Sequence, residues 1–240
     1  MTKLRLTILQ LYPDEMNIYG DWGNTLTLIK RAEWHGFEVQ HIDYNPGDDF
    51  PSDVDIIIGG GGQDSGQLKV RDDLQKIAPK LQQLAASGTP MLMICGMYQL
   101  FGRFFKTSTG EILEGIEIFN AETHAGPERM IGNVIIESKK FGDIVGYENH
   151  SGQTFIDHGS TPLGRVVRGA GNNGKDESEG LIENNVIGTY LHGSLLPKNP
   201  QIADFLIEQA VLKKYGEFTP KIVDDHFAEK AREIAKKRPR

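Results

Sequence analysis

The sequence predicts an α/β protein with a mixed, mostly parallel sheet flanked by helices, and three observations lead to that prediction. Segments with strand and helix patterns alternate over the first hundred residues. Two short apolar runs, 54–58 and 90–94, have the continuous hydrophobicity of strands buried on both faces. Each run ends at a residue, Gly59 or Cys95, from which the chain turns toward a helix. Parallel strands need such crossover helices.

The first half of the chain contains the main elements of this sheet. Strands are expected at 4–12, 37–42, 54–58 and 90–94. Asp21 or Asn24 is a suitable N-cap for the first helix, and Gly36 ends that helix before the second strand. Another helix is expected at 68–86, and a further one after Cys95.

Beyond Phe105 the chain changes to shorter β-rich segments with little helix between them. These segments are expected at 116–124, 131–136, 154–156, 163–168 and 181–191. We interpret them as the second half of one domain that covers residues 1–220. A helix at 200–215 precedes an amphipathic basic C-terminal tail, residues 221–240, which is either a solvated surface helix or a helix that contacts a partner.

The whole chain has the composition of a globular protein without a membrane span or a nucleic acid partner. Its 240 residues can bury a substantial core, and its formal net charge of −7 argues against general nucleic acid binding. The longest apolar runs are far shorter than the ~20 residues that span a bilayer. One cysteine excludes an internal disulfide, and the absence of a leader pattern after Met1 favours a cytoplasmic location, with any membrane role peripheral.

The stretch 90–102 places Cys95, the only cysteine, between a buried strand and a helix. Gly96 permits the sharp reversal, and a helix N-terminus favours the thiolate form of a cysteine through its dipole and free N–H groups. A lone cysteine is more often a structural core residue. Its neighbours in the fold must therefore decide between a core thiol and a nucleophile.

The glycine run 59–62 follows the other buried strand and leaves backbone N–H groups free. A phosphate loop is one interpretation, but this run lacks the P-loop and dinucleotide patterns. The glycine spacing of a dinucleotide site occurs at 169–174, where no helical pattern follows, so a hairpin turn is expected there. The other interpretation of 59–62 is an oxyanion hole shared with the turn at Cys95, because both loops follow strand C-terminal ends.

His192 is the candidate general base among seven histidines. It ends the apolar run 186–191 and lies, like Cys95, at a strand-to-loop junction. No two histidines have helical metal-ligand spacing, and one cysteine cannot build a cysteine-rich zinc site. We therefore expect no metal in this chain.

Two polar clusters in the second half offer further candidate site residues. Arg129 ends the cluster 123–129, and its planar guanidinium suits the binding of a carboxylate. The stretch 147–152 combines an aromatic residue, Glu148 and a histidine in a short segment that looks like a turn. Ordinary exposed loop polarity is the competing interpretation for both clusters.

In their order along the chain, these motifs resemble the class I glutamine amidotransferases of the cobyric acid synthase (CobB/CobQ) type. The resemblance extends from about residue 4 to residue 212. It is carried by the glycine loop, by Ile94-Cys95-Gly96 with Gln99, by the stretch 146–152 and by Tyr190-Leu-His192-Gly193. The resemblance implies the flavodoxin-like fold of that family.

The resemblance also implies roles for single residues. Cys95 would attack the glutamine carboxamide, and His192 would pass the thiol proton to the departing ammonia, leaving a thioester for water to hydrolyse. Backbone N–H groups of Gly61 and Gly96 would hold the oxyanion, and Arg129 would grip the substrate.

The N-terminal stretches 11–14 and 16–24 narrow the resemblance to glutaminase subunits that form a heterodimer with a Mur-ligase-like subunit (MurT). That partner is expected to use ATP and Mg²⁺, whereas this chain is expected to need no cofactor. Ammonia released here would amidate D-isoglutamate in lipid II, the peptidoglycan precursor bound by the partner.

One position departs from the family pattern. Many class I amidotransferases carry a glutamate two residues beyond the catalytic histidine, and this chain has Ser194 there. A third group normally orients the imidazole. Either Glu148 takes that place, or the ligase subunit supplies an acid, or the site works without one.

Three classes of protein are compatible with these residues, and the glutaminase subunit is favoured. An amidotransferase that serves another acceptor, such as a corrinoid, is a variant of it. The second class is an elbow-cysteine thiol or stress protein of the same general fold, and the third is a non-catalytic flavodoxin-like scaffold with Cys95 in its core.

Overall fold

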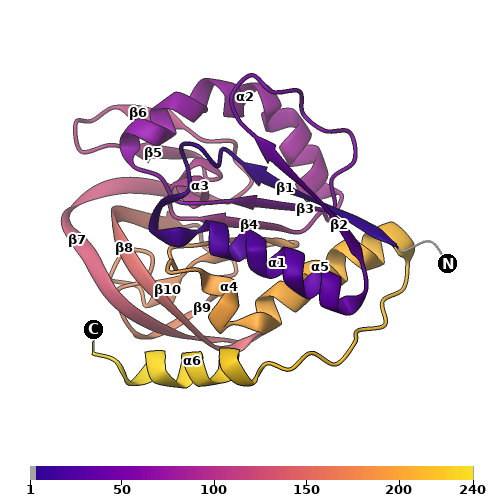
Figure 1. Ribbon diagram of the computed structural model, residues 1–240. Helices are drawn as coiled ribbons and strands as arrows, with labels where there is room; N and C mark the ends of the chain where they lie inside the picture. The colour runs from indigo at the N-terminus through magenta and orange to yellow at the C-terminus, as the bar shows by residue number, and fades with distance from the viewer. Residues whose placement is uncertain (1–3, 240) are drawn as a thin grey trace.

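A computed structural model describes residues 4–239 and contains two six-stranded sheets, with most of the helices packed around the first (Figure 1). The first sheet has the strand order β11-β12-β4-β3-β1-β2. All its neighbouring pairs run parallel except β11 with β12. Its strands are β1 Arg5–Leu11, β2 Glu38–Tyr44, β3 Ile56–Gly59, β4 Met91–Ile94, β11 Leu181–Glu183 and β12 Val186–Thr189. The predicted α/β fold is confirmed.

Helices cover both faces of this sheet. The helix α2 lies on one side, and α1 and α5 lie on the other (Figure 1). The helical segments are η1 Ile18–Gly20, α1 Trp22–His35, α2 Asp64–Ala86, α3 Gly96–Leu100, α4 Leu195–Lys198, α5 Pro200–Tyr215 and α6 His226–Lys237. The helix expected at 200–215 is confirmed, and α2 begins four residues before the expected start because its polar first turn carries no apolar periodicity.

The second sheet lies beside the first and contains the β-rich half of the chain. Its strands are β5 Phe104–Lys106, β6 Ile112–Glu114, β7 Ala121–Ser138, β8 Gly142–Ile156, β9 Gly164–Arg168 and β10 Ser178–Glu179. The long antiparallel pair β7 and β8 dominates it. β9 pairs with β10 across residues 169–177, so the expected hairpin turn at 169–174 is confirmed.

Three expectations about the second half were wrong. The segments 116–124 and 131–136 are largely one strand, β7, which changes register between Ala125 and Met130. The stretch 147–152 is not a turn, because it lies inside β8, where polar residues alternate with buried ones. The segment 181–191 is a hairpin of two strands that reverses at Asn184, a residue with φ of 54°.

The parallel strands bring distant parts of the chain to one edge of the first sheet. Loops leave β1, β3, β4 and β12 at their C-terminal ends, which is where ligands bind in open α/β sheets. The second sheet reaches the same edge, because Tyr147 of β8 forms an isolated antiparallel bridge with His192. The candidate site residues therefore meet where the two sheets adjoin.

Candidate active site

Cys95 lies at the sharp turn between β4 and α3, as the sequence predicts. Its φ of 49° and ψ of −103° are unusual for a residue with a Cβ, and they turn the chain directly from strand into helix. Its N–H donates to the Thr189 carbonyl of β12 at 2.8 Å, and the residue is only 6% exposed. The thiol is thus fixed at the strand end, beside the strand that leads to His192.

His192 is fully buried and stands next to the thiol. The backbone N–H of His192 donates to the Tyr147 carbonyl at 2.7 Å, and its ring lies edge to face against Tyr19 with centroids 5.1 Å apart. Burial alone would lower the pKa of His192. The charge and hydrogen bond of Cys95, together with Asp21, instead raise the pKa to about 10. These contacts favour the protonated, imidazolium form of His192.

Asp21 is the third polar group of the site, and the sequence analysis assigned it only a capping role. Its carboxylate lies 3.3 Å from Nδ1 of His192 and accepts the Gly61 N–H at 2.7 Å. Asp21 directly precedes α1, yet its side chain makes no capping bond because it is turned into the site. It is 3% exposed. The chain therefore supplies its own acid to the imidazole.

Glu148 does not take that place. Its buried carboxylate accepts the N–H groups of Ala170 and Gly171, each at 2.9 Å, and so holds the loop after β9. The alternative in which Glu148 orients the imidazole is therefore wrong for this structure. Ser194 hydrogen-bonds the Gly20 carbonyl at 2.6 Å, which ties the His192 loop to the segment that carries Asp21.

The glycines of the loop 59–62 do not have the roles that the sequence analysis expected. The N–H of Gly61 is taken by Asp21, so the expectation that it holds an oxyanion disagrees with the structure. A Cβ on Gly61 would lie 2.5 Å from Cε1 of His192, so this glycine makes room for the imidazole. Gly62, not Gly61, lines the cavity, and its nitrogen lies 3.1 Å from where a Cβ on Gly96 would be. Gly62 is the glycine placed to face a substrate, and Gly96 packs directly behind it.

A cavity of about 350 Å³ opens beside Cys95. Arg129 and Asn149, from the neighbouring strands β7 and β8, stand on its wall. The Arg129 Nε donates to Asn149 Oδ1 at 2.7 Å, and its Nη2 donates to the Tyr19 hydroxyl at 3.2 Å. A guanidinium, an amide and a thiol thus share a space of amino acid size.

His150 forms a neutral part of the same wall and stacks on the buried ring of Tyr190. The two rings stack with centroids 3.6 Å apart, and His150 Nδ1 lies 2.7 Å from the Gly152 carbonyl. Burial lowers the pKa of His150 to about 3, so its ring is neutral at physiological pH. The Tyr190 hydroxyl accepts a bond from Gln99 at 3.1 Å. The histidine of the stretch 147–152 therefore shapes the cavity without carrying charge.

The buried carboxylate of Glu179 holds the strand end that leads to His192 through hydrogen bonds. Glu179 accepts bonds from the Thr189 hydroxyl at 2.5 Å and from the Tyr190 N–H at 2.9 Å. Burial raises the pKa of Glu179 to about 7. Sequence patterns did not single out this residue, because its significance depends on the pairing of β10 and the β11–β12 hairpin against the loop.

Within residues 4–239, no group of three or more His, Cys, Asp or Glu side chains is arranged to hold a metal ion. None of the helices described there is long and apolar enough to cross a membrane.

The fold and the thiol, imidazole and carboxylate at its strand ends are typical of α/β enzymes that use a cysteine nucleophile. Sequence comparison narrows the class. Residues 7–200 match the CobB/CobQ-like glutamine amidotransferase domain, and the chain belongs to that family. The resemblance found in the sequence motifs is confirmed.

Full-length relatives and solved structures agree with this assignment. The chain is 40% identical to the lipid II isoglutaminyl synthase (glutamine-hydrolyzing) subunit GatD of Staphylococcus aureus, over 95% of this chain and 94% of the relative. The subunit of the same name from Streptococcus pneumoniae is 37% identical, over 89% and 83% respectively. A glutamine amidotransferase structure from Thermotoga maritima shares the fold with a TM-score of 0.56 and 14% identity, covering 96% of this chain and 93% of that one.

Proposed function

We propose that this protein is the glutamine-hydrolysing subunit of a lipid II isoglutaminyl synthase. The observation that carries the proposal is the meeting of Cys95, His192 and Asp21 at a cavity whose wall holds Arg129. The relatives named as such subunits match along nearly the whole chain, which supports the same assignment here.

Hydrolysis begins with the pair of Cys95 and His192. The Cys95 thiolate attacks the carboxamide carbon of glutamine, and the carbonyl electrons move to oxygen. Backbone N–H groups of Gly62 and Gly96 are the donors proposed for this oxyanion. The His192 imidazolium then protonates the departing nitrogen, so ammonia leaves and a glutamyl thioester remains.

Release of glutamate reuses the same groups. Neutral His192 removes a proton from water, the hydroxide attacks the thioester, and the thiolate leaves. Asp21 keeps the ring of His192 oriented and stabilises its charge in both halves of the reaction. Its Oδ2 is itself fixed by the Gly61 N–H, so the acid is held by backbone as well as by the imidazole.

The substrate's α-carboxylate is proposed to bind Arg129. A guanidinium offers two parallel donors to a carboxylate, which no lysine in the same place could reproduce. Asn149 and Tyr19 hold this side chain on the cavity wall in the absence of substrate. The size of the cavity, about 350 Å³, suits one amino acid.

Ammonia would be used by a second subunit. The relatives are named as one subunit of a synthase, and we propose a Mur-ligase-like partner that holds ATP and Mg²⁺. That partner would activate the D-isoglutamate carboxylate of lipid II, which ammonia converts into D-isoglutamine. Because lipid II is membrane-linked, the heterodimer would work at the cytoplasmic face of the membrane.

Active-site labelling tests the glutaminase part of the proposal. The isolated chain is incubated with 6-diazo-5-oxo-norleucine, an electrophilic glutamine mimic, and the modified residue is located by mass spectrometry. We expect Cys95 to be labelled and glutamine to protect it. An unlabelled Cys95 in the folded chain would favour the scaffold interpretation.

Reconstitution tests the acceptor. The chain is mixed with the purified Mur-ligase-like subunit, glutamine, ATP and Mg²⁺, and either lipid II or a corrinoid acid is supplied. Amidated lipid II is the expected product. Amidation of the corrinoid alone would replace the acceptor and leave the glutaminase assignment in place.

A further inference from the structure

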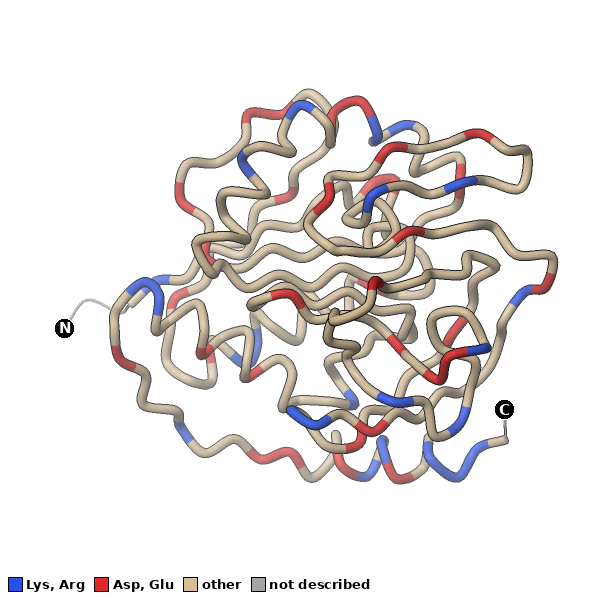
Figure 2. The backbone as a smooth tube through the Cα atoms, turned by 180° about the vertical axis from the view of Figure 1, so that it is seen from behind, with Lys and Arg blue, Asp and Glu red and all other residues tan. Residues whose placement is uncertain are grey.

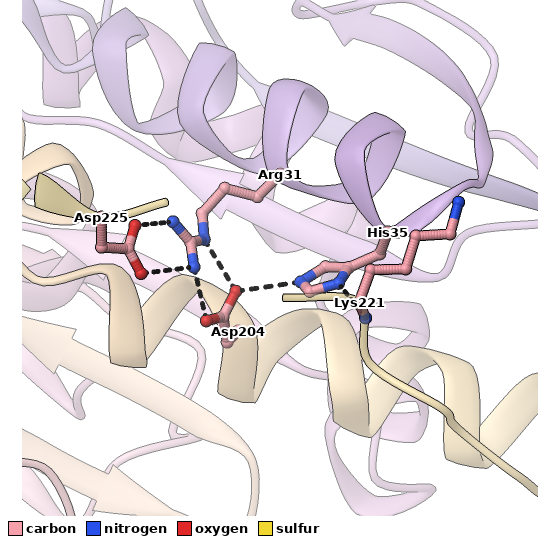
Figure 3. Close-up of polar contacts among 5 residues, drawn as sticks. All are labelled: Arg31, His35, Asp204, Lys221 and Asp225. Atoms are coloured by element: carbon pink, nitrogen blue, oxygen red, sulfur yellow. Dashed lines mark hydrogen bonds and ion pairs between the residues drawn. The ribbon is translucent and has the colours of Figure 1, made fainter. Parts of the chain in front are cut away.

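The C-terminal arm, residues 217–239, is fastened to the body of the protein at the buried Arg31 and, nearer its end, by Lys236 with Asp143 and by the Asn133 amide with the Pro239 carbonyl. Arg31 of α1 binds Asp204 of α5 through two nitrogens, at 2.7 and 2.6 Å, and binds Asp225 of the arm at 2.5 Å (Figure 3). His35 accepts the Lys221 N–H at 3.2 Å and lies 3.3 Å from Asp204. The arm is therefore held as an ordered part of the surface.

The helix of this arm, α6, turns its apolar side toward solvent. Phe227 is 80% exposed, Ile234 is 49% exposed, and Ala231 between them is also exposed. The side that packs against α4, β7 and β8 carries Ala228, Arg232 and Ala235, which are only half-buried. In α6, which the structure describes throughout, no residue is buried. An amphipathic helix whose apolar stripe faces water lacks its usual reason to form.

This stripe adjoins a groove against α1, which we call the α1/α6 groove. A cavity of about 300 Å³ is lined by Leu26 and Trp34 of α1, Pro197 of α4 and Phe227 of α6. Leu26 is 44% exposed and Trp34 is 54% exposed. Trp34 and Phe227 together expose on the order of 200 Å² of aromatic surface. A concave site with such anchors is typical of the centre of a protein interface.

The groove is bordered by two helices that begin close in sequence to the catalytic residues. The helix α1 begins directly after Asp21, and α4 begins three residues after His192. At the start of α1, Trp22 is 39% exposed, one helical turn before Leu26. A protein seated in the groove would lie against both helices that start at the catalytic pair.

The groove lining itself has charges of both signs, Lys30 and Arg31 with Asp224 and Asp225, so the charge of α6 beside it indicates what would bind there. Residues 226–240 contain six basic and two acidic residues, although the whole chain has a formal charge of −7. The basic residues gather toward the end of α6 (Figure 2). Exposed Lys230 and Lys237 each follow a member of the apolar stripe by three residues and so flank it. An apolar segment with acidic flanks complements this surface.

A protein segment fits these observations better than a lipid bilayer. An interfacial helix inserts a protruding apolar face into lipid, whereas Leu26, Trp34 and Phe227 enclose a hollow into which a side chain can fit. We propose that the α1/α6 groove is the docking surface of the ligase-type subunit, which inserts an apolar segment flanked by acidic side chains. This proposal rests on the proposed function, because it names the partner of that site.

The test compares substitutions that introduce a negative charge at exposed apolar residues inside and outside the groove. Trp34→Glu and Phe227→Glu are each titrated calorimetrically with the purified Mur-ligase-like subunit. Ile112→Glu is the control, since Ile112 of β6 is also 54% exposed and lies outside the groove. We expect each groove variant to raise the Kd about tenfold or more, and the control to leave it within about twofold.

A double variant tests whether the basic side chains beside the groove attract the acidic flanks of the partner segment. Lys230→Glu combined with Lys237→Glu should slow association and reduce the salt dependence of the Kd. Thermal melts of all variants check folding, and Cys95 labelling of each isolated variant reports on the glutaminase site separately. A folded variant that is still labelled and has a raised Kd supports the proposal.

Two outcomes would overturn it. The first is a Kd unchanged by both Trp34→Glu and Phe227→Glu in a chain that binds the subunit. The second is groove-dependent binding to phosphatidylglycerol vesicles with no groove-dependent binding to the subunit. In both outcomes, glutamine-protected labelling of Cys95 would leave the glutaminase assignment standing, whereas loss of labelling in the wild type would contradict that assignment instead.

Discussion

Replacement of Asp21 by asparagine tests the catalytic arrangement most directly. The substitution keeps the shape of the side chain and removes its charge. In the wild type, the Asp21 carboxylate accepts one hydrogen bond from the Gly61 N–H and contacts Nδ1 of His192. Asparagine keeps one acceptor oxygen and replaces the other carboxylate oxygen by an NH2 group, which is a donor and carries no negative charge for the imidazolium.

The expected fall in kcat can be estimated from the distance between the Asp21 carboxylate and the His192 ring and from their burial. At 3.3 Å and an effective dielectric constant of about 20, the attraction between carboxylate and imidazolium is about 5 kcal/mol. Part of it remains in the variant, because asparagine keeps a dipole and one hydrogen bond. A loss of about 3 kcal/mol corresponds to a fall in kcat of about 150-fold.

The assay is steady-state glutamine hydrolysis over a range of pH. Asp21 helps to raise the pKa of His192 to about 10, so its loss lowers that pKa. The alkaline limit of kcat should therefore move toward neutral pH in the Asp21→Asn variant. Asp72→Asn is the control, because the Asp72 side chain is 78% exposed and pairs only with surface groups.

One result would contradict the role of Asp21 in catalysis. If Asp21→Asn keeps kcat within about threefold of the wild type at every pH, this acid does not orient the imidazole. Either an acid from the ligase subunit would then orient the imidazole in the heterodimer, or the site would work without one.

Four other predictions follow from contacts at the site and at the C-terminal arm. In Cys95→Ala, the thiolate no longer supports the imidazolium, so an NMR titration should find the pKa of His192 well below about 10; an unchanged pKa would contradict the ion pair. Arg129→Ala should raise the KM for glutamine about 10- to 100-fold, since a charged hydrogen bond contributes about 1.5–3 kcal/mol, and an unaltered KM would exclude the carboxylate role. Gly61→Ala should depress kcat strongly, because its Cβ would lie 2.5 Å from the His192 ring, and full activity in a folded variant would contradict that geometry. Arg31→Met should lower the melting temperature and release the C-terminal arm to proteolysis; equal cleavage in both proteins would show that the arm is held by other contacts.

The sequence was most informative where a pattern is local. The buried strands around residues 54–58 and 90–94 appear as continuous apolar runs, because both of their faces are covered. Cys95 and His192 each follow such a strand, so their convergence could be expected from parallel topology. Helix α5 was predicted with its observed bounds, and its ends carry local signals, since Pro200 suits the first helical turn and Gly216 ends the helix in the left-handed conformation.

Long-range pairing was harder to predict. The strands β7 and β8 form one long hairpin, from Ser138 and Gly142 at the turn to Ala121 and Ile156 at its open end, and the polar stretch 147–152 looks like a loop until its partner strand is known. The length of a strand depends on its neighbours more than on its own residues. The second sheet was therefore divided into pieces that were too short.

Asp21 shows most clearly what the sequence alone could not predict. In the sequence it stands among glycines and asparagines, 171 residues before His192, and a capping role is the natural local interpretation. The sequence could show that a thiol and an imidazole lie at strand ends, because the apolar pattern of each strand and the residue that follows it are both local features. Only the packing of the loop after β1 against the Gly61 amide and the His192 ring decided which carboxylate completes the site, since that choice depends on contacts between segments with no sequence relation.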